Sequence, residues 1–586
     1  LVNAERYITQ ELKEYEEKRQ DCSNLQKGQR GKRKSKNEIK HMKRIGLIVI
    51  LCAMVCSIWA IPARRGGIVK TQPDGSEVVV YQHGDEFFHW ETNEKGEWLA
   101  LDKDGFYQVT EALSKETISA KRAASPLHIA PKEEVASPLN IAPKGLVILV
   151  NFADLAFTET IEEMDSMHNG MNYTRDYEYV YRGKTYQVSS EGSVRQYFYD
   201  ASFGQYNPQF DVIGPVTVSR EYSYYGKNTA ATDFDQRPWE MIKEACLLAD
   251  TVWNVDFTQY DNDGDGKVDF VYVIYAGYGE ADGGGANTIW PHSYQLSAAG
   301  VYCQVDGVRV NLYACGNEID YFTKQHTGIG TFCHEFSHVL GLPDLYTTEG
   351  QTHKTWGEWS ILDYGPYNND GNTPPSYSAY ERFFMGWLTP EVIVDSANIR
   401  LEELNSSQQV LLISTGDKHN LIGNDPQSTR FYLLENRQQH GWDAYLPGHG
   451  LMLTYVQYNA NTWKGNTVNN NSRSMGVDLI EADGKTPNSS GSGYLGKATD
   501  LFPAGATAYT NITDHAIEEI EEIDGVIHFK YRGGAVGTHV EDVEIPTSVI
   551  AIYNILGQKQ PTTDMQALSA GTYIVVTTTG TRKIIR

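Results

Sequence analysis

The chain has 586 residues, a net charge of −25 and 11% aromatic residues, among them 37 tyrosines. This length exceeds what one hydrophobic core supports, so several folded units are expected, and the aromatic content excludes a disordered chain. The charge is uneven, because residues 1–45 hold 13 Lys and Arg against 7 Asp and Glu, which leaves −31 on the remainder. An acidic body excludes nucleic acid as a partner and suits an extracellular protein that binds hard cations.

The first recognisable segment is an apolar run from Leu47 to Ile61, which follows basic residues and precedes a Pro-Ala pair. A basic start, a short apolar core and small residues are typical of a secretory signal peptide, which we place at residues 42–63. The run is short for a membrane span, although an N-terminal membrane anchor is the alternative. Residues 1–41 are highly charged and unlike a signal sequence. We interpret them as an upstream extension that is absent from the mature protein.

Residues 64–144 are predicted to form a small folded unit followed by a linker. Glu77–Tyr81 reads E-V-V-V-Y, which is typical of a strand. Between Lys121 and Lys144 a proline-bearing segment occurs twice, and we expect it to be extended and exposed, with Lys121-Arg122 and Lys144 as candidate processing sites. A folded unit followed by a cleavable linker indicates a propeptide. No cysteine lies between residues 64 and 144, which excludes inhibition by a thiolate from this segment.

Residues 145–394 are predicted to be the largest unit, a mixed sheet with helices. Gly145–Phe152 is a continuous apolar run suited to a buried strand. Val194–Ala201 and Trp239–Val252 are predicted helices. Four cysteines remain outside the upstream and signal segments, and in an exported chain they allow two disulfides, while buried free thiols are the alternative. These are Cys246, Cys303, Cys315 and Cys333.

A glycine-containing loop ahead of the predicted strand Val268–Tyr275 carries acidic residues at alternate positions. They are Asp261, Asp263, Asp265 and Asp269. Hard oxygen ligands around a tight turn are typical of calcium sites, so the loop is a candidate calcium site. Position 12 counted from Asp261 is Tyr272 instead of the bidentate glutamate of an EF-hand. The alternative is a polar turn of solvated acids.

The stretch Gly328–Tyr346 contains His334, Glu335 and His338 in the arrangement H-E-x-x-H. On a helix, positions i and i+4 share one face, so both imidazoles can bind a single metal ion. Glu335 lies next to the first histidine and can act as general base on a metal-bound water. Two imidazoles and one carboxylate in this layout indicate the zinc site of a metalloprotease.

The residues after this motif predict a third ligand. Gly341 can take the left-handed conformation that ends a helix, and Pro343 prevents the helix from resuming. The resulting turn would return Asp344 toward the metal, which completes the three protein ligands of a catalytic zinc site. A more distant glutamate, Glu358, is the alternative third ligand.

Trp359–Gly365 is predicted to form a tight turn beneath the metal. Proteases with this extended zinc motif usually carry Met there, and Leu362 occupies the corresponding position. A leucine of similar volume can serve as the same hydrophobic floor. Tyr364 is a candidate hydrogen-bond donor to the oxyanion of the tetrahedral intermediate, with a packing role as the alternative.

Short strands separated by Gly, Asn and Asp turns fill residues 395–534 and predict a β-sandwich. The clearest strands are Phe431–Glu435 and Gly450–Val456. Residues 535–586 repeat the pattern on a smaller scale, with strands predicted at Val549–Ile555 and Gly571–Thr577. The fold class is therefore α+β multidomain, with a protease unit followed by β-sandwich units.

The run H-E-F-S-H-V-L-G-L-P-D from His334 to Asp344 resembles the zinc signature of the immune inhibitor A-type metallopeptidases. The likeness extends to Trp290–Ser293, Tyr380–Arg382 and Glu435–Gln438. The resemblance implies a metzincin-like, secreted zinc endopeptidase that is made as a zymogen and stabilised by calcium. Carried over residue by residue, it implies that His334, His338 and Asp344 bind zinc and that Glu335 is the catalytic base. Leu362 departs from the methionine of the family.

Ser548–Arg586 is similar to the C-terminal sorting domain of the type IX secretion system, through Tyr553–Gln558 and Leu568–Tyr573. That likeness implies contact with secretion machinery and release from the cell or attachment to its outer surface. The sequence as a whole predicts an endopeptidase that acts on proteins or peptides and keeps no transmembrane segment after signal removal. The alternative is an inactive, protease-like surface adhesin.

Overall fold

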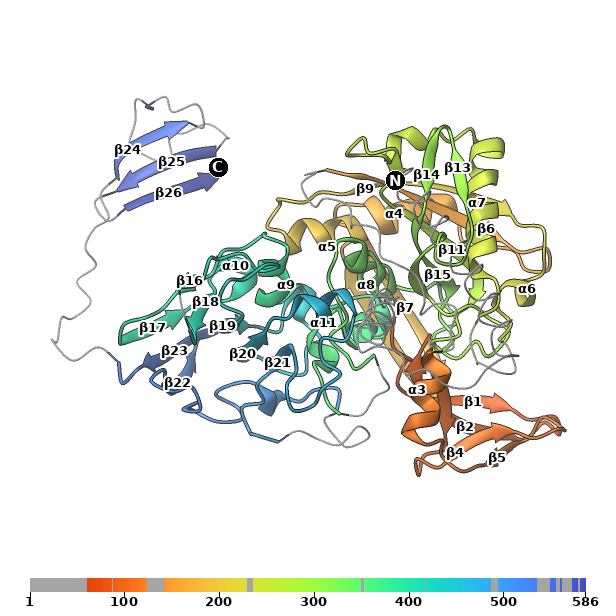
Figure 1. Ribbon diagram of the computed structural model, residues 1–586, viewed down its shortest axis with the longest axis horizontal. Coiled ribbons are helices and arrows are strands. Elements are labelled where there is room, and N and C mark those ends of the chain that lie inside the picture. Colours follow the sequence, from red (N-terminus) through yellow and green to blue (C-terminus); the bar gives the residue numbers. More distant parts are fainter. Residues whose placement is uncertain are drawn as a thin grey trace, which may run out of the picture.

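The computed structural model describes residues 61–123, 142–228, 235–348, 353–485 and 494–534, with single gaps at 87 and 417, and the short segments 549–554, 559–560, 572–577 and 580–585 (Figure 1). The predicted upstream extension, most of the predicted signal peptide, most of the repeated linker and residues 555–558 and 561–571 of the predicted sorting domain lie outside the described residues. Within the described residues, no helix combines the length and apolar content that a membrane crossing needs.

The first unit is a five-stranded antiparallel sheet followed by one helix, drawn in orange in Figure 1. The strands pair in chain order, and the predicted strand Glu77–Tyr81 is confirmed as the first part of β2. The elements are β1 (Gly67–Thr71), β2 (Glu77–Asp85), β3 (Phe88–Thr92), β4 (Trp98–Leu101), β5 (Tyr107–Val109) and α3 (Lys115–Ala123). This unit lies against the catalytic unit through Arg122, whose guanidinium pairs with Asp85 at 2.7 Å and donates to the carbonyl of Thr348. Arg122 is buried, so cleavage at this predicted processing site requires the ion pair to open.

The central unit is built on a five-stranded mixed sheet in the order β12-β15-β11-β6-β9. Neighbouring strands are parallel except at the edge, where β12 is antiparallel to β15. The strands are β6 (Lys144–Asn151), β9 (Gln209–Thr217), β11 (Val271–Tyr278), β12 (His292–Gln295) and β15 (Leu312–Ile319). Residues 146–150 of β6 are fully buried, as the apolar run predicted. The internal position of β6, between β11 and β9, explains why its sequence shows no polar alternation.

Helices and smaller sheets surround this sheet. The predicted helices are confirmed as α5 (Val194–Ala201) and α7 (Pro238–Trp253). The remaining helices are α4 (Ile161–Asn169), α6 (Tyr222–Gly226), α8 (Gly330–Val339) and α9 (Ala379–Phe384). The remaining strands are the hairpin β7 (Thr174–Tyr181) and β8 (Lys184–Glu191) and the small sheet of β10 (Lys267–Val268), β14 (Val308–Val310) and β13 (Cys303–Val305). The predicted strand after the acidic loop is thus interrupted between β10 and β11.

The third unit contains two sheets that share a hydrophobic core. One has the order β16-β18-β19-β20-β21 and the other the order β17-β23-β22. Their bounds are β16 (Glu391–Val392), β17 (Ala397–Leu401), β18 (Leu411–Ser414), β19 (Arg430–Arg437), β20 (Gly450–Gln457), β21 (Val477–Leu479), β22 (Ile517–Ile523) and β23 (Val526–Tyr531), with the short helices α10 (Leu404–Ser407) and α11 (Ala460–Lys464). The predicted strands at 431–435 and 450–456 are confirmed as parts of β19 and β20.

The five-stranded sheet of this unit is buried on both faces. In β19, Tyr432 and Leu434 belong to the core shared with the three-stranded sheet. Phe431 and Leu433, which point to the opposite face, belong to the large core of the catalytic unit. The third unit therefore packs directly against the catalytic unit. The C-terminal strands β24 (Val549–Asn554), β25 (Thr572–Thr577) and β26 (Gly580–Ile585) form a separate antiparallel sheet.

Candidate metal centre

Helix α8 carries the H-E-x-x-H residues and is buried at every position except Thr331. Its N-terminal end packs tightly against residues 365–371, because a Cβ atom on Gly330 would lie 2.0 Å from the carbonyl oxygen of Pro366. Phe332 stacks on Tyr272 at 4.1 Å between ring centroids, which fixes the helix on strand β11. His334 and His338 lie one turn apart on the same face, so their Nε2 atoms are 3.0 Å apart.

The helix ends at the predicted position. Gly341 has a φ of +100°, and the amide of Leu342 donates to the carbonyl of Ser337. This turn returns the chain so that Asp344 Oδ1 lies 3.3 Å from His334 Nε2 and 3.2 Å from His338 Nε2. Three donors about 2.0–2.2 Å from one tetrahedral zinc ion would be separated by roughly these distances. Asp344 Oδ1 is buried and accepts no hydrogen bond from the residues that the structure describes, which fits an oxygen that binds a metal.

Backbone carbonyls orient the two imidazoles. His334 Nδ1 lies 2.7 Å from the carbonyl oxygen of Ile361, and His338 Nδ1 lies 2.9 Å from that of Leu342. When Nδ1 of each imidazole donates its proton to a carbonyl, the lone pair of Nε2 stays available to bind a metal. Burial alone would raise the pKa of Asp344, but the two histidines hold it at about 2. The aspartate is therefore ionised, as metal binding requires.

The third unit supplies a residue that sequence reasoning missed. Asn466, which follows α11, donates from Nδ2 to Asp344 Oδ2 at 2.5 Å and accepts from the amide of Asp344 at 2.8 Å. Asn469 donates to the carbonyl of Leu345 at 2.8 Å, so two asparagines hold this segment. In the sequence, the asparagine-rich run at 466–471 is the feature that could have indicated these contacts. Its partners lie over a hundred residues away, which no local pattern reports.

The turn at 360–365 lies against both ligand-bearing segments. Ile361 accepts from His334, and the carbonyl of Leu362 accepts from the amide of Leu345 at 2.8 Å. The Leu362 side chain is fully buried. Backbone carbonyls therefore make the hydrogen bonds to the ligand segments, and the departure from methionine at Leu362 leaves them unchanged.

Glu335 faces a segment from the start of the described chain. Its Oε1 accepts from the amide of Ile61 at 3.0 Å, while Oε2 has no hydrogen-bond partner among the described residues. Burial raises the pKa of Glu335, and the nearby carboxylates of Asp344 and Glu86 raise it further. A carboxylate with a raised pKa is a stronger proton acceptor than one in water.

Residues 61–65, which we name the N-terminal strip, cross the catalytic unit at this point. Trp290 Nε1 donates to the carbonyl of Ile61 at 3.0 Å, and the Tyr367 hydroxyl donates to that of Pro62 at 2.7 Å. Residues 61–63 are also the end of the predicted signal peptide, which stays a prediction. In this structure, Ile61 and Ala63 share a buried apolar cluster with Trp290. The strip therefore covers Glu335.

Tyr364, the candidate oxyanion donor, also contacts the strip. Its hydroxyl accepts from Arg65 Nε at 3.2 Å, and burial raises its pKa to about 12. The tyrosine is thus neutral at ordinary pH and able to donate. Glu358, the alternative third ligand, is not in the described group of metal-binding atoms, which comprises His334, His338 and Asp344.

The acidic loop brings three of its four carboxylates together. Asp261, Asp263 and Asp265 have oxygens within 4.8 Å of one another. Asp269 is not in this group, because its Oδ2 accepts from the amide and the Nδ2 of Asn262, at 2.6 and 2.9 Å. The three grouped carboxylates are partly or fully exposed and accept hydrogen bonds from amides of the same loop.

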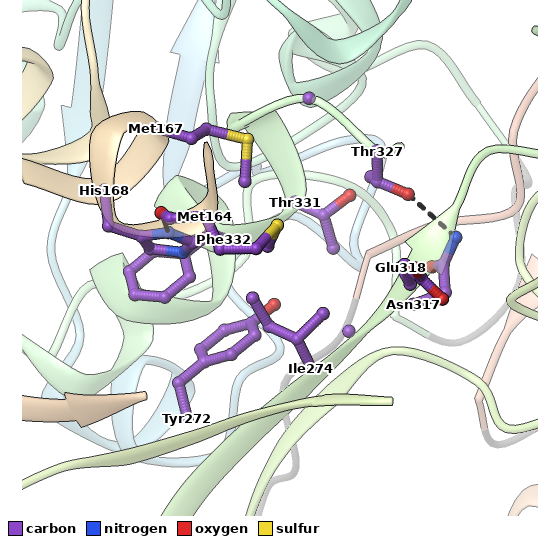
Figure 2. Close-up of a pocket in the computed structure, with 12 residues that line it drawn as sticks. Met164, Met167, His168, Tyr272, Ile274, Asn317, Glu318, Thr327, Thr331 and Phe332 are labelled. Carbon is purple, nitrogen blue, oxygen red and sulfur yellow. Dashed lines mark hydrogen bonds between the residues drawn. The ribbon is translucent and has the colours of Figure 1, made fainter. Parts of the chain in front are cut away.

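All four cysteines of the mature segment are buried free thiols in the structure. Cys246 lies beside Cys303, and a hydrogen bond between these thiols raises the pKa of Cys246. Cys333, next to His334, is not bridged, so no disulfide braces α8 in this structure. A small pocket lies between Phe332, Tyr272 and the methionines of α4 (Figure 2).

Comparison with known proteins agrees with this geometry. Residues 137–388 match the family described as immune inhibitor A peptidase M6, catalytic domain. The chain is similar to the pre-pro-metalloprotease PrtV of Vibrio cholerae serotype O1 (strain M66-2), at 26% identity over 305 residues, 46% of this chain and 32% of the relative. It is also similar to immune inhibitor A of Bacillus thuringiensis subsp. alesti, at 29% identity over 272 residues, 41% of this chain and 39% of the relative. The chain thus spans well under half the length of these relatives. Residues 137–388 are therefore similar to the catalytic domain of the M6, or immune inhibitor A, peptidases, which are metallopeptidases.

Proposed function

We propose that the protein is a secreted zinc endopeptidase. The observation that carries the proposal is the buried group of His334, His338 and Asp344, with an unpaired Asp344 oxygen facing both imidazoles. These residues would hold zinc, which supplies a Lewis acid that polarises the scissile carbonyl and lowers the pKa of water. Glu335 would take the proton from the attacking water and pass it to the leaving amine. Tyr364 would donate to the oxyanion.

The protein would be made as a zymogen, with residues 64–144 as propeptide and linker. The support is Arg65 of the N-terminal strip, which follows the predicted signal peptide and donates to the Tyr364 hydroxyl. A substrate needs this hydroxyl, so Arg65 must leave before hydrolysis. The Arg122 ion pair would keep the propeptide in place until cleavage in the linker.

Other parts of the proposal concern stability and export. Asp261, Asp263 and Asp265 would bind calcium and stabilise the start of β11. The catalytic domain would be metzincin-like, with residues 395–534 as a β-sandwich packed on it. Residues 535–586 would engage the type IX secretion machinery, so that the enzyme is released or attached to the outer cell surface. An inactive surface adhesin is the second candidate, but intact ligands and an intact base favour the enzyme.

Zymography on casein tests the proposal. The full-length protein, treated with limiting trypsin to open the linker, should clear casein, and the untreated protein should clear far less. A zinc chelator should abolish the activity, and added zinc should restore it. Clearing that survives the chelator would refute the zinc mechanism, and absence of clearing in zinc-loaded, trypsin-treated protein would favour the adhesin.

A further inference from the structure

Arg64 of the N-terminal strip occupies a built acidic pocket. Its Nη1 pairs with Asp320 and its Nη2 lies 2.5 Å from Asp370 Oδ1. The guanidinium also lies over the ring of Phe322, 4.4 Å from the centroid. Only 7% of the Arg64 surface is exposed. Two carboxylates and an aromatic face are the partners that best suit a planar guanidinium.

The catalytic unit builds this pocket, and its acids have their own supports. Asp320 Oδ1 accepts from the amides of Phe322 and Thr323 at 2.9 and 2.8 Å, and Asp370 Oδ2 accepts from the Tyr179 hydroxyl at 2.8 Å. These bonds do not involve Arg64. The two carboxylates should therefore keep their positions after the strip departs.

A third buried acid, Asp282, lies behind the pair. Asn317 donates to Asp282 Oδ2 at 3.3 Å, and Figure 2 shows the same amide directed at Thr327. Asp282 Oδ1 has no hydrogen-bond partner in the described structure. Lys324 also faces this group, but its ammonium lies on the ring of Tyr321 at 3.6 Å. Loss of Arg64 thus removes the cation that pairs with Asp320 and Asp370, which is costly for the buried carboxylate of Asp320.

The backbone of the strip shows which substrate position would reach the pocket. The Ile61 nitrogen lies at Glu335, where a leaving amine must receive its proton, so Ile61 stands in the first position after the scissile bond. Trp290 donates to the carbonyl of Ile61, and Tyr367 donates to the carbonyl of Pro62. The amide of Arg64 donates to the carbonyl of Ala281 at 2.8 Å. These contacts use only main-chain groups of the strip. Any peptide can therefore adopt the same register, with its fourth residue at the position of Arg64.

We infer that the pocket of Asp282, Asp320 and Asp370 is a specificity subsite that binds an arginine or lysine side chain four residues after the scissile bond of a substrate. The inference rests on the proposed peptidase function, and it extends that function from peptide bonds in general to substrates with a basic residue at this position. In the zymogen, Arg64 fills the subsite as a substrate side chain would.

Peptides that differ only at the fourth position test the inference. Trypsin-activated, zinc-loaded full-length protein is given fluorogenic peptides with Ile-Pro-Ala after the scissile bond and then Arg, citrulline, Ala or Glu. We expect kcat/KM for Arg to exceed that for citrulline by about tenfold and that for Glu by more, because citrulline keeps the shape but not the charge. Moving the Arg to the fifth position should abolish the gain.

Two variants test whether the pocket causes the preference for arginine at the fourth position. Asp320→Asn and Asp370→Asn keep the acceptor oxygens that their neighbours use, and each should reduce the Arg-to-citrulline ratio of kcat/KM to about two. Asp395→Asn removes the same charge from an exposed position and should preserve the ratio. Equal rates for the Arg and citrulline peptides would overturn the subsite yet leave the peptidase intact. No cleavage of any peptide would instead overturn the proposed function.

Discussion

Two groups of residues in this protein have spacings typical of metal sites, but they differ in construction. His334, His338 and Asp344 are buried, and each has a second partner that orients it. The acids at 261, 263 and 265 are partly or fully exposed, and amides of their own loop already satisfy them. The first group leaves one buried oxygen unpaired, whereas the second leaves none of its oxygens buried and unpaired in the described structure.

This difference shows what a spacing pattern can and cannot establish. A buried carboxylate without a donor is costly unless a cation compensates it, so burial turns the first pattern into a strong requirement for metal. Exposed carboxylates have water as a partner and carry no such requirement. The two groups should therefore respond very differently to mutation and to metal removal.

The largest expected effect is the loss of a ligand from the buried group. Asp344→Ala should reduce bound zinc from about one ion per chain to a small fraction and lower peptide hydrolysis by roughly 10³-fold or more, because the chemistry depends on the ion. Elemental analysis of dialysed protein and a peptide assay measure the two quantities. Asp265→Ala is the matched control and should retain its zinc. Normal zinc in Asp344→Ala would exclude Asp344 as a ligand.

The next largest effect separates metal binding from chemistry within the buried group. Glu335→Gln keeps the shape of the side chain but cannot accept a proton, so kcat should fall by about 10²–10⁴-fold while zinc content stays unchanged. Circular dichroism and zinc analysis establish that the variant is folded and loaded. Wild-type turnover in such a preparation would be incompatible with Glu335 as the general base.

The sequence was sufficient for the parts of the site that depend on local geometry. Helical spacing places two imidazoles on one face, and the positive φ at Gly341 returns Asp344 to them. The same holds for α5, whose predicted and observed bounds coincide. These features need only a few consecutive residues, which is the range over which backbone preferences act.

The remaining features of the site depend on tertiary contacts. Asn466 reaches Asp344 across 122 residues, and Ile61 reaches Glu335 across 274 residues. Ile61 also belongs to the predicted signal peptide, and the apolar pattern of that stretch does not report its tertiary contacts. At the acidic loop, the alternation of acidic residues correctly predicted a turn. It also included Asp269 among the candidate calcium ligands, whereas Asp269 accepts a hydrogen bond from Asn262 in the structure. Composition cannot distinguish a carboxylate that faces a metal from one that faces a backbone amide.

A moderate effect is expected from the support that the third unit gives to the buried group. Asn466→Leu removes both hydrogen bonds to Asp344 at similar volume, and zinc affinity should fall by about 10–100-fold. Competition with a fluorescent chelator measures this affinity. Asn471→Leu, at an exposed position of the same asparagine-rich run, should leave the affinity unchanged. Equal affinities in both variants would show that the catalytic unit alone fixes Asp344.

The smallest expected effect belongs to the exposed acidic loop. Calcium that binds only the folded loop should raise the melting temperature by about 2–4 °C for each kcal/mol of binding free energy, for a unit of 150–250 residues. Asp263→Asn should remove this shift, because it takes away one of three grouped charges, whereas Asp256→Asn, a nearby exposed acid outside the group, should preserve it. Differential scanning calorimetry with calcium or with a calcium-selective chelator provides the measurement. If saturating calcium leaves the melting temperature unchanged, the loop is a polar turn. Zinc content should stay constant throughout these experiments, because the loop shares no residue with the buried group.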